Sequence, residues 1–296
     1  MHHNHRYSHS ETPHRTLVLV ILLTVGFAFI EIAGGYFSHS LSLLGDAGHM
    51  TSDAIALGIT AFASWIASHP PSPRHSYGLG RAEVIAAWVS SLLMFVVSLI
   101  VIVQAVKRIH HPLPIQTFPI IIIAIAGILL NLLFAKLLSS NKKSLNIHAA
   151  LLHVLSDLIG TGAALISGIV ISFTHWTLID PLLSVFISVL IMVSSAQLLH
   201  KSMMVLMESV PHHLNIFQVS QTIDRFDGVK SVHDIHIWTL SSGTTALSAH
   251  INIKNLTIWD DLLLGLKAIL KQKYHIDHIT LQPEVNIKDC NPCYKI

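Results

Sequence analysis

Charged residues and cysteines are scarce in this sequence. Of its 296 residues, 11% are Asp, Glu, Lys or Arg, and the formal net charge is only +2. So small a charge, with no basic patch interleaved with aromatic residues, gives no sign of a nucleic-acid partner. Neither cysteine, Cys290 or Cys293, lies in an apolar segment, which argues against a thiolate pathway for Cu(I).

Apolar residues, by contrast, make up 52% of the chain, and six stretches are long enough to cross a bilayer. We expect membrane spans near residues 16–37, 43–67, 83–106, 115–138, 148–173 and 178–200. The segment before the first span is rich in histidine and lacks a small-residue cleavage site, so we expect no cleavable signal peptide. The sequence therefore predicts a multi-pass α-helical membrane protein with a six-helix bundle.

Lysine and arginine are distributed unequally between the two sides of these spans. If the amino terminus is inside, that side holds most of the basic residues near the spans: Arg6, Arg15, Arg74, Arg81, Lys136, Lys142, Lys143 and Lys201. The other side holds only Lys107 and Arg108. By the positive-inside rule both termini are cytoplasmic, and in a bacterium the protein would lie in the inner (plasma) membrane.

Beyond about residue 208 the apolar runs shorten and the density of charge rises. Two segments show helical periodicity and three resemble strands: 214–226 and 257–273 for helices, and 229–240, 245–253 and 279–287 for strands. This α-β-β-α-β order predicts a small cytoplasmic α+β domain. The predicted organisation is a His-rich tail (1–15), a membrane domain (16–208), the cytoplasmic domain (209–287) and a carboxyl-terminal tail (288–296).

Two short motifs inside the spans combine a histidine with an aspartate four residues later. His49 precedes Asp53 in the second span, and His153 precedes Asp157 in the fifth. Four residues make about one helical turn, so each pair lies on one helix face. If the two faces meet, two imidazoles and two carboxylates surround one point, which is a tetrahedral N/O set suited to Zn²⁺.

Ionisable side chains are costly in lipid, and no Lys or Arg lies within the spans near this depth to neutralise the aspartates. A bound cation or a proton is the partner that these carboxylates need. Two imidazoles favour Zn²⁺, Cd²⁺ or Co²⁺ over Mn²⁺, and also over Mg²⁺ and Ca²⁺, which prefer oxygen ligands. Two further acids lie in the spans: Asp46 could line an access path, and Glu31 is either functional or a structural hydrogen-bond partner.

Metal ligation requires neutral histidine and ionised aspartate, so binding of Zn²⁺ displaces protons. We therefore expect proton-coupled export by alternating access, in which protons compete the metal off on the outer side. Three alternatives are an exporter of another divalent ion such as Mn²⁺, a membrane-embedded metalloenzyme, and a metal sensor without transport. A His-Glu-x-x-His motif is missing and four protein ligands leave no place for catalytic water, so a secondary transporter is favoured over an enzyme.

Three motifs resemble the cation diffusion facilitator family, and most closely its zinc-exporting branch of bacterial type. They are the run SLSLLGDAGHMTSD ending at Asp53, the loop HSYGLGRAE ending at Glu83, and HAALLHVLSD ending at Asp157. Asp180-Pro181 at the start of the sixth span is also similar. The resemblance covers nearly the whole chain, and it implies a homodimeric, proton-coupled exporter with six membrane helices and a metallochaperone-like cytoplasmic domain.

The resemblance also implies roles for single residues. The family's transport site matches the two His-Asp motifs: His49, Asp53, His153 and Asp157. Leu152 falls where family members place an apolar gate residue, although ordinary packing would explain it equally well. Arg81 and Glu208 fall where some members have an interlocking charge pair at the dimer waist, and such a pair matters only if it is buried, because surface pairs contribute little.

Some relatives hold a second metal in the loop between the second and third spans, using an Asp and two His. In this chain His75 matches one histidine, but Leu79 occupies the other position and Ser72 lies near the expected Asp. We therefore expect this loop site to be absent or weak, unless His69 compensates.

Further metal ligands are expected in the cytoplasmic domain. His233 and His250, on neighbouring predicted strands, match family positions that bind metal at the dimer interface. On the last strand Gln282-Pro283-Glu284 resembles the family's Gln-x-Glu form, with Glu284 as ligand, and His278 or Asp277 could complete the set. Without the resemblance, these histidines would be read as ordinary surface groups of strands.

Cys290 and Cys293 form a Cys-x-x-Cys motif in a tail expected to be cytosolic, where cysteines stay reduced. The spacing is half of a zinc-binding set. Some family members complete such a set with an amino-terminal histidine of the neighbouring subunit, and the alternative is a tail that catches metal nonspecifically. The residues do not decide whether these sites regulate transport or stabilise the dimer.

Overall fold

The structure is a computed structural model that describes residues 14–139, 145–241 and 243–285, with side chains described over 22–136, 154–241 and 243–285. By its internal contacts the chain divides into two compact units. The first contains residues 1–58 and 90–196, and the second contains residues 59–89 and 197–296.

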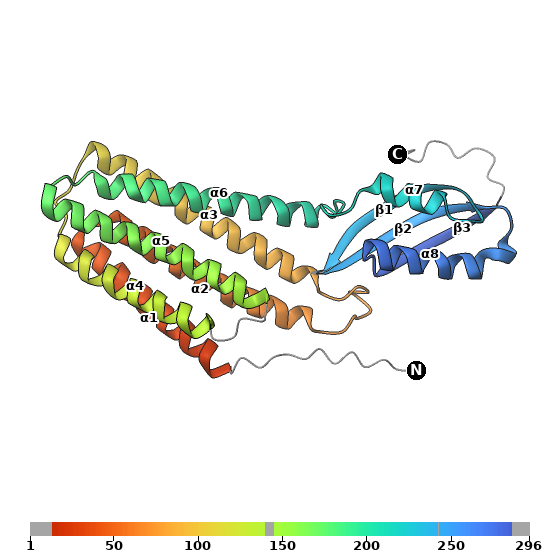
Figure 1. Cartoon of the computed structure of the whole chain (residues 1–296), viewed down its shortest axis with the longest axis horizontal. Helices are drawn as coiled ribbons and strands as arrows, with labels where there is room; N and C mark the ends of the chain where they lie inside the picture. The colour runs from red at the N-terminus through yellow and green to blue at the C-terminus, as the bar shows by residue number, and fades with distance from the viewer. Residues whose placement is uncertain (1–13, 140–144, 242, 286–296) are drawn as a thin grey trace. The chain divides into compact units, whose positions relative to one another are not determined.

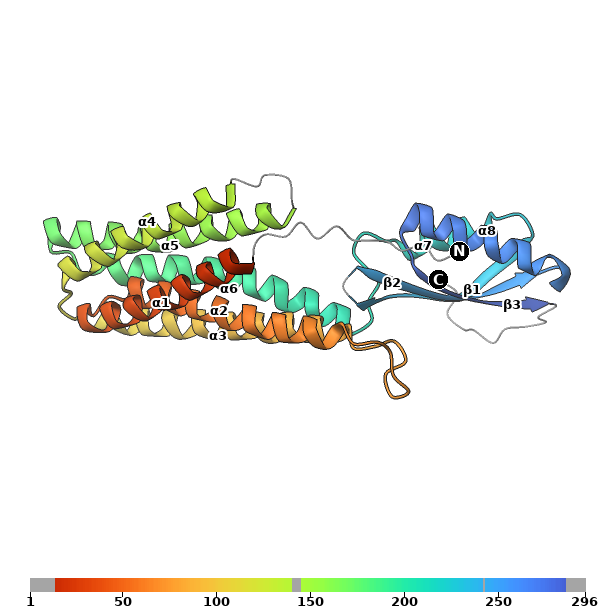
Figure 2. The same ribbon diagram turned by 90° about the horizontal axis from the view of Figure 1, so that it is seen from below.

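The six predicted spans correspond to six long helices: α1 (His14–Ser38), α2 (Leu41–Ala67), α3 (Arg81–His110), α4 (Thr117–Ser139), α5 (Leu145–Thr174) and α6 (Ile179–Leu206). Among the residues described, α2 to α6 are each long and apolar enough to cross a membrane, and the described part of α1, Leu22–Ser38, is a shorter apolar helix. The prediction of a multi-pass helical membrane protein is confirmed. Figures 1 and 2 both show α4 and α5 side by side, and α1 also packs against α4.

Small residues let the helices of the first unit approach closely. Leu43 of α2, Ala124 of α4 and Ala164 of α5 form one buried cluster. A side chain at Gly127 of α4 would meet the methyl group of Thr161 at 2.8 Å, so α4 and α5 pack at a distance that only glycine allows there. Contacts of this kind drive helix association in lipid, where the hydrophobic effect does not.

A buried carboxylate holds the start of α2. Asp180, at the start of α6, is fully buried and accepts hydrogen bonds from the backbone N–H of Leu41 at 2.6 Å and from the hydroxyl of Ser40 at 2.7 Å. The hydroxyl groups of Ser42 and Ser167 also donate to it. A side chain from another helix therefore satisfies orphan N–H groups of α2, which a buried helix end requires.

The second unit contains a three-stranded sheet with two helices on one face, as Figure 2 shows. Its elements follow the predicted order: α7 (Ile216–Asp224), β1 (Val229–Ser241), β2 (Thr244–Ile253), a 3₁₀ turn η1 (Leu256–Ile258), α8 (Trp259–Tyr274) and β3 (His278–Val285). Strand β2 is central, antiparallel to β1 and parallel to β3. The prediction of an α-β-β-α-β domain is confirmed.

Alternation along the strands decides which side chains the helices cover. Leu247, Ala249, Ile251 and Ile253 of β2 point into the core with Leu266 and Leu270 of α8. The alternate residues of β2, including Ser248 and His250, therefore lie on the opposite, open face of the sheet. Side chains of this domain that bind a ligand are therefore expected on the open face of the sheet.

Candidate metal centres

Three of the four predicted membrane ligands converge in the first unit. His49 and Asp53 lie one turn apart in α2, and Asp157 lies in α5. The Nε2 atom of His49 is 3.7 Å from a carboxylate oxygen of Asp53 and 3.7 Å from one of Asp157. One ligand atom from each residue lies within 4.8 Å of the others, so a single ion between them would contact all three.

The surroundings of this cluster suit a dication held inside the membrane domain. The side chains of His49, Asp53 and Asp157 are each no more than 12% exposed. A cavity of about 230 Å³ opens beside them, lined by helices α2, α3, α5 and α6 and including Asp46, Ser156 and Ser194. A buried set of one imidazole and two carboxylates, open to a cavity lined by both apolar and polar side chains, can bind a borderline metal ion and exchange it.

The fourth predicted ligand, His153, lies in α5 one turn before Asp157, and the predicted gate residue Leu152 lies beside it. The side chains of both residues fall outside the described part of the structure. Because the backbone of this segment is helical, His153 occupies the same face of α5 as Asp157.

Asp46, considered from sequence as a residue of an access path, lines the cavity and is buried. The hydroxyl of Thr161 donates to its carboxylate at 2.7 Å and also lies 2.9 Å from the carbonyl oxygen of Asp157. Glu31 of α1 is fully buried, and its carboxylate interacts electrostatically with those of Asp46 and Asp157. Two further buried acids, Asp46 and Glu31, thus lie near the candidate metal site.

A second cluster lies on the open face of the cytoplasmic sheet. His233 of β1 and His250 of β2 are direct cross-strand partners. Glu284 of β3 contacts both, with its two oxygens 3.0 Å from Nε2 of His233 and 2.6 Å from Nδ1 of His250. These three residues are half-buried and offer ligand atoms within 4.8 Å of one another.

His278 and Asp277 are not brought to this cluster. His278 pairs in register with Ala246, whereas His250 pairs with Gln282, four residues further along β3. The ring of His278 packs edge-on against Tyr77. The backbone N–H of Asp277 instead bonds the carbonyl oxygen of Thr245. The expectation that one of them completes the set has no support in the arrangement of this chain, because they lie at the other end of β3 from Glu284.

The residue that does approach the cluster is Asp234, which sequence reasoning missed. One of its carboxylate oxygens lies 3.7 Å from Nε2 of His250 and the other 3.1 Å from Nε2 of His236. A regular strand would send Asp234 to the face opposite its neighbour His233. The exception is visible in the left-handed backbone of Asp234, with φ of 50°, and no pattern in the sequence predicts it.

The loop between α2 and α3 does not gather metal ligands among the residues that the structure describes. His75 is exposed, and its Nδ1 lies 3.4 Å from the hydroxyl of Ser72. His69 instead bonds the carbonyl oxygen of Trp65 and packs against its ring. The expectation that this loop holds no metal site, or only a weak one, stays a prediction.

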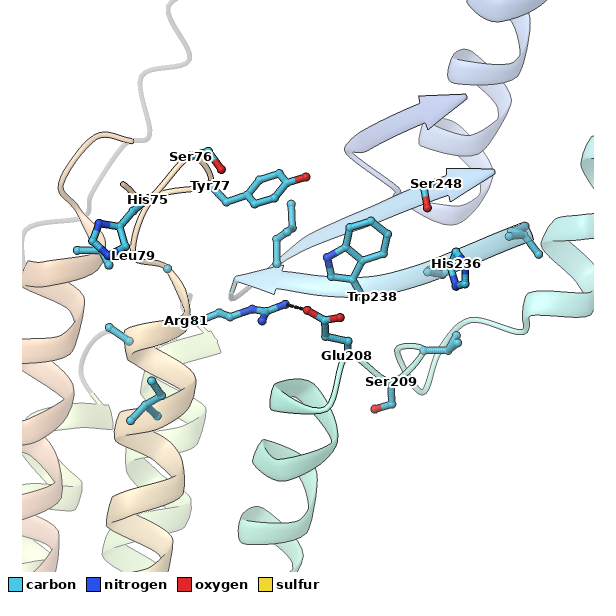
Figure 3. A pocket seen from close by; sticks show the side chains of 18 of the residues that line it. His75, Ser76, Tyr77, Leu79, Arg81, Glu208, Ser209, His236, Trp238 and Ser248 are labelled. Atoms are coloured by element: carbon cyan, nitrogen blue, oxygen red, sulfur yellow. Dashed lines mark hydrogen bonds and ion pairs between the residues drawn. The ribbon is translucent and has the colours of Figure 1, made fainter. Parts of the chain in front are cut away.

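Arg81 and Glu208 form an ion pair within the second unit, with 2.8 Å between the guanidinium and carboxylate (Figure 3). They border a cavity of about 870 Å³ that also includes Tyr77, Trp238 and His236. The side chains of Arg81 and Glu208 are 37% and 60% exposed in the single chain, where such a pair contributes little stability. Cys290 and Cys293 lie outside the described residues.

Comparison with known proteins gives consistent matches over the whole chain. The family model "Cation efflux transmembrane domain" matches residues 17–207, and "Cation efflux protein, cytoplasmic domain" matches residues 211–285. The chain is 35% identical to the "Cadmium, cobalt and zinc/H(+)-K(+) antiporter" of Bacillus velezensis over 294 residues, which cover 96% of this chain and 92% of that protein.

Two further matches come from Escherichia coli and Cupriavidus metallidurans. The "Zinc transporter ZitB" of Escherichia coli is 34% identical over 301 residues, covering 99% of this chain and 94% of that protein. A solved structure of the metal-bound C-terminal domain of the CzcD transporter from Cupriavidus metallidurans is 36% identical, with a TM-score of 0.23, and covers 24% of this chain and 99% of that one.

Proposed function

This chain belongs to the cation efflux family, and on that premise we propose that it exports Zn²⁺ from the cytoplasm in exchange for protons. It is a multi-pass membrane protein whose relatives are named as transporters and antiporters, not as enzymes. The observation that carries the proposal is the convergence of His49, Asp53 and Asp157 from two membrane helices onto one point.

The transport site in this proposal is a tetrahedral set of two histidines and two aspartates. His153, one turn before Asp157, supplies the second imidazole from the same face of α5. Such a set favours Zn²⁺, and Cd²⁺ and Co²⁺ are the next candidates because they accept the same nitrogen and oxygen ligands. The relative from Bacillus velezensis is named for these three metals, which supports this set of candidates.

Exchange with protons follows from the chemistry of the ligands. The metal binds neutral imidazole and ionised carboxylate, so every dication that leaves makes room for protons on the same atoms. In one state the site opens to the cytoplasm and loads metal, and in the other it opens outward, where protons displace it. Leu152, next to His153, is our candidate for an apolar gate between these states.

The orientation of the chain in the bilayer follows from its basic residues. Arg74 lies in the loop before α3, Arg81 is the first residue of α3, and Lys136 and Lys201 lie near the carboxyl ends of α4 and α6. We therefore assign both termini and the α+β domain to the cytoplasm, in the inner membrane of a bacterium. In domain terms, residues 16–208 form the membrane part and 209–287 the cytoplasmic part, between a His-rich tail (1–15) and a Cys-x-x-Cys tail (288–296).

We further propose that the protein acts as a homodimer. The cluster of His233, His250 and Glu284 would bind a regulatory or structural divalent ion beside the interface, and the Arg81–Glu208 pair would be buried there. Cys290 and Cys293 would add a weaker site in the tail. Burial is the condition for the ion pair to matter, because its Coulomb energy is largely screened while it stays exposed.

The proposal is tested in proteoliposomes that contain a Zn²⁺ indicator and a pH-sensitive dye. Zn²⁺ movement should be accompanied by proton movement in the opposite direction, and an imposed pH gradient should accelerate it. Cd²⁺ and Co²⁺ should compete, and Mn²⁺ should compete poorly. Asp53→Ala should abolish both signals, whereas Ser194→Ala, which lines the same cavity without offering a carboxylate or imidazole, should retain them. Zinc flux that ignores the pH gradient would reject proton coupling.

A further inference from the structure

Strand β1 contains a β-bulge beside the cytoplasmic cluster. His233 pairs with His250 and His236 pairs with Ser248, so Asp234 and Ile235 together face a single residue of β2, Ala249. The backbone of Asp234 is left-handed, with φ of 50°. Asp and Asn tolerate this conformation better than other residues with a side chain, and an extra residue in it is a recurrent feature of bulges.

The bulge places two neighbouring residues on the same face of the sheet. Ile235 and Ile237 belong to the core beneath the helices, as a regular alternation from Ile237 backwards requires. The same alternation would bury His233, yet His233 contacts His250 and Glu284 on the open face. One extra residue therefore brings both His233 and Asp234 to that face.

His250 consequently lies between two carboxylates. Its Nδ1 is 2.6 Å from Glu284, which also contacts His233, and its Nε2 is 3.7 Å from Asp234. A histidine that binds a metal through one ring nitrogen uses the other as an N–H donor. Here Nδ1 faces the cluster of possible ligands, and Nε2 faces the single acid that stands outside it.

The carboxylate of Asp234 is itself held in place. Its second oxygen lies 3.1 Å from Nε2 of His236, the next histidine of β1. Asp234 thus has one oxygen for each of two imidazoles, and the bulge fixes the direction in which its side chain leaves the strand. Such support from outside the ligand set orients ligating histidines in metal sites.

We propose that Asp234 is a positioning residue of the cytoplasmic metal site. Its carboxylate, 3.7 Å from Nε2 of His250, approaches to accept the Nε2–H when metal binds, and so presents the Nδ1 lone pair to a divalent cation bound with His233 and Glu284. Asp234 does not contact the cation. The inference rests on the cytoplasmic metal site of the proposed function, and it is independent of transport through the membrane site.

The test is a titration of the purified full-length protein with Zn²⁺ alone, followed by calorimetry. The membrane and tail ligands are first removed by His49→Ala, Asp53→Ala, Cys290→Ser and Cys293→Ser, so that the cytoplasmic site dominates the signal. Two variants are then compared in this background, Asp234→Gly and Asp234→Asn. Glycine adopts a positive φ without strain, so the bulge survives in Asp234→Gly and only the carboxylate is lost.

We expect Asp234→Gly to weaken Zn²⁺ binding by about 10–100-fold, the usual effect of losing an acid that orients a ligating histidine. Asp234→Asn should recover part of this loss, because its amide oxygen still accepts a hydrogen bond and Asn tolerates the left-handed backbone. The midpoint of thermal unfolding should be unchanged or higher in Asp234→Gly. Asp227→Asn, which removes an exposed carboxylate elsewhere in the same domain, should bind as the parent does.

The companion variant His250→Ala separates two ways in which the inference can fail. If His250→Ala abolishes binding while Asp234→Gly binds as tightly as the parent, Asp234 has no positioning role. If neither variant weakens binding, the cluster is not a metal site, and this inference falls together with the cytoplasmic part of the proposed function. Neither result touches export through the membrane site, which is measured separately as flux.

Discussion

Asp157 serves the first unit through both its side chain and its backbone. Its carboxylate is one of the three converging ligand groups, and its carbonyl oxygen lies 2.9 Å from the hydroxyl that also reaches Asp46. One threonine, Thr161, therefore connects the candidate metal site to a buried acid on α2. A proton or metal ion that binds Asp157 therefore binds a residue that Thr161 links to Asp46.

The imidazole of His49 should decide which metal the site prefers. In His49→Asp the set gains a third carboxylate and loses a nitrogen, which suits harder ions such as Mn²⁺ better. We expect the ratio of Zn²⁺ to Mn²⁺ transport to fall by about tenfold or more, which corresponds to about 1.4 kcal/mol. Competition between the two ions in proteoliposomes measures the ratio, and an unchanged preference for zinc would show that the histidine does not set selectivity.

Single residues differed in how far the sequence revealed them. The spacing placed His49 and Asp53 on one face of α2, because a helix of known period fixes which residues share a face, whereas their approach to Asp157 depends on how α2 and α5 pack. Asp234 was missed because its position depends on a bulge, and a bulge depends on pairing with a distant strand. His278 was suggested as a residue that could complete the set with Glu284, but it lies six residues before Glu284 on the same extended strand, which separates the two.

At the scale of helices, the contact between α2 and α5 depends on Gly160. A methyl group on this residue would lie 2.3 Å from a carboxylate oxygen of Asp46. Asp46 has a short side chain and is buried, so it has little room to move. Gly160→Ala should therefore force α2 and α5 apart at the level of the metal site, at a cost of about 1–3 kcal/mol, which is typical of overpacking.

The expected result for Gly160→Ala is a strong loss of Zn²⁺ flux together with a lower midpoint of thermal unfolding in detergent. Gly162→Ala is the matched control, since it lies in the same helix and its added methyl group meets nothing within 4 Å. That variant should be neutral or slightly stabilising, because alanine favours helix over glycine. Equal loss of flux in both variants would contradict a specific role for the close approach at Gly160.

Asp180 should matter for the position of α2, although it is far along the chain. Asp180→Asn replaces an acceptor oxygen by an N–H₂ group, which cannot accept from Leu41 and the hydroxyl groups of Ser40 and Ser42 together. We expect a loss of about 1–3 kcal/mol in stability. Thermal unfolding followed by circular dichroism measures it, and Ser188→Ala, a buried hydroxyl further along α6, should change it much less.

The elements themselves were largely predictable, and the contacts between them were not. Hydropathy located α2 to α6 because lipid demands long apolar helices, and period-two alternation located β1 and β2. The helices run past the predicted ends, for example α6 to Leu206, because polar residues at a membrane surface continue a helix without apolar periodicity. The cap that Asp180 provides for α2 joins residues far apart in sequence, so local patterns carry no sign of it.

For the whole molecule, the proposed topology is tested by finding on which side of the membrane each loop lies. In a chain with Cys290 and Cys293 replaced by serine, a cysteine at His111 should react with a membrane-impermeant reagent added to intact cells, because the proposed topology places this loop outside. A cysteine at Ser76 should react only after permeabilisation. The reverse pattern would invert the assignment made from basic residues and would place the α+β domain outside the cell.

The central claim is that Asp157 helps to bind the ion that crosses the membrane. Bound zinc per chain and zinc flux should therefore be measured on the same preparations of two proteins, one with and one without Asp157→Ala. Both should lack the cytoplasmic and tail ligands through His233→Ala, Glu284→Ala, Cys290→Ser and Cys293→Ser, so that bound zinc reports the membrane site. Ser194→Ala serves as the control for a change in the same cavity.

We predict that Asp157→Ala loses both the bound zinc and the flux while its oligomeric state and thermal midpoint stay close to those of the parent. Ser194→Ala should keep both. If Asp157→Ala still binds zinc and transports it at the parent's rate, the converging residues of α2 and α5 are not the transport site.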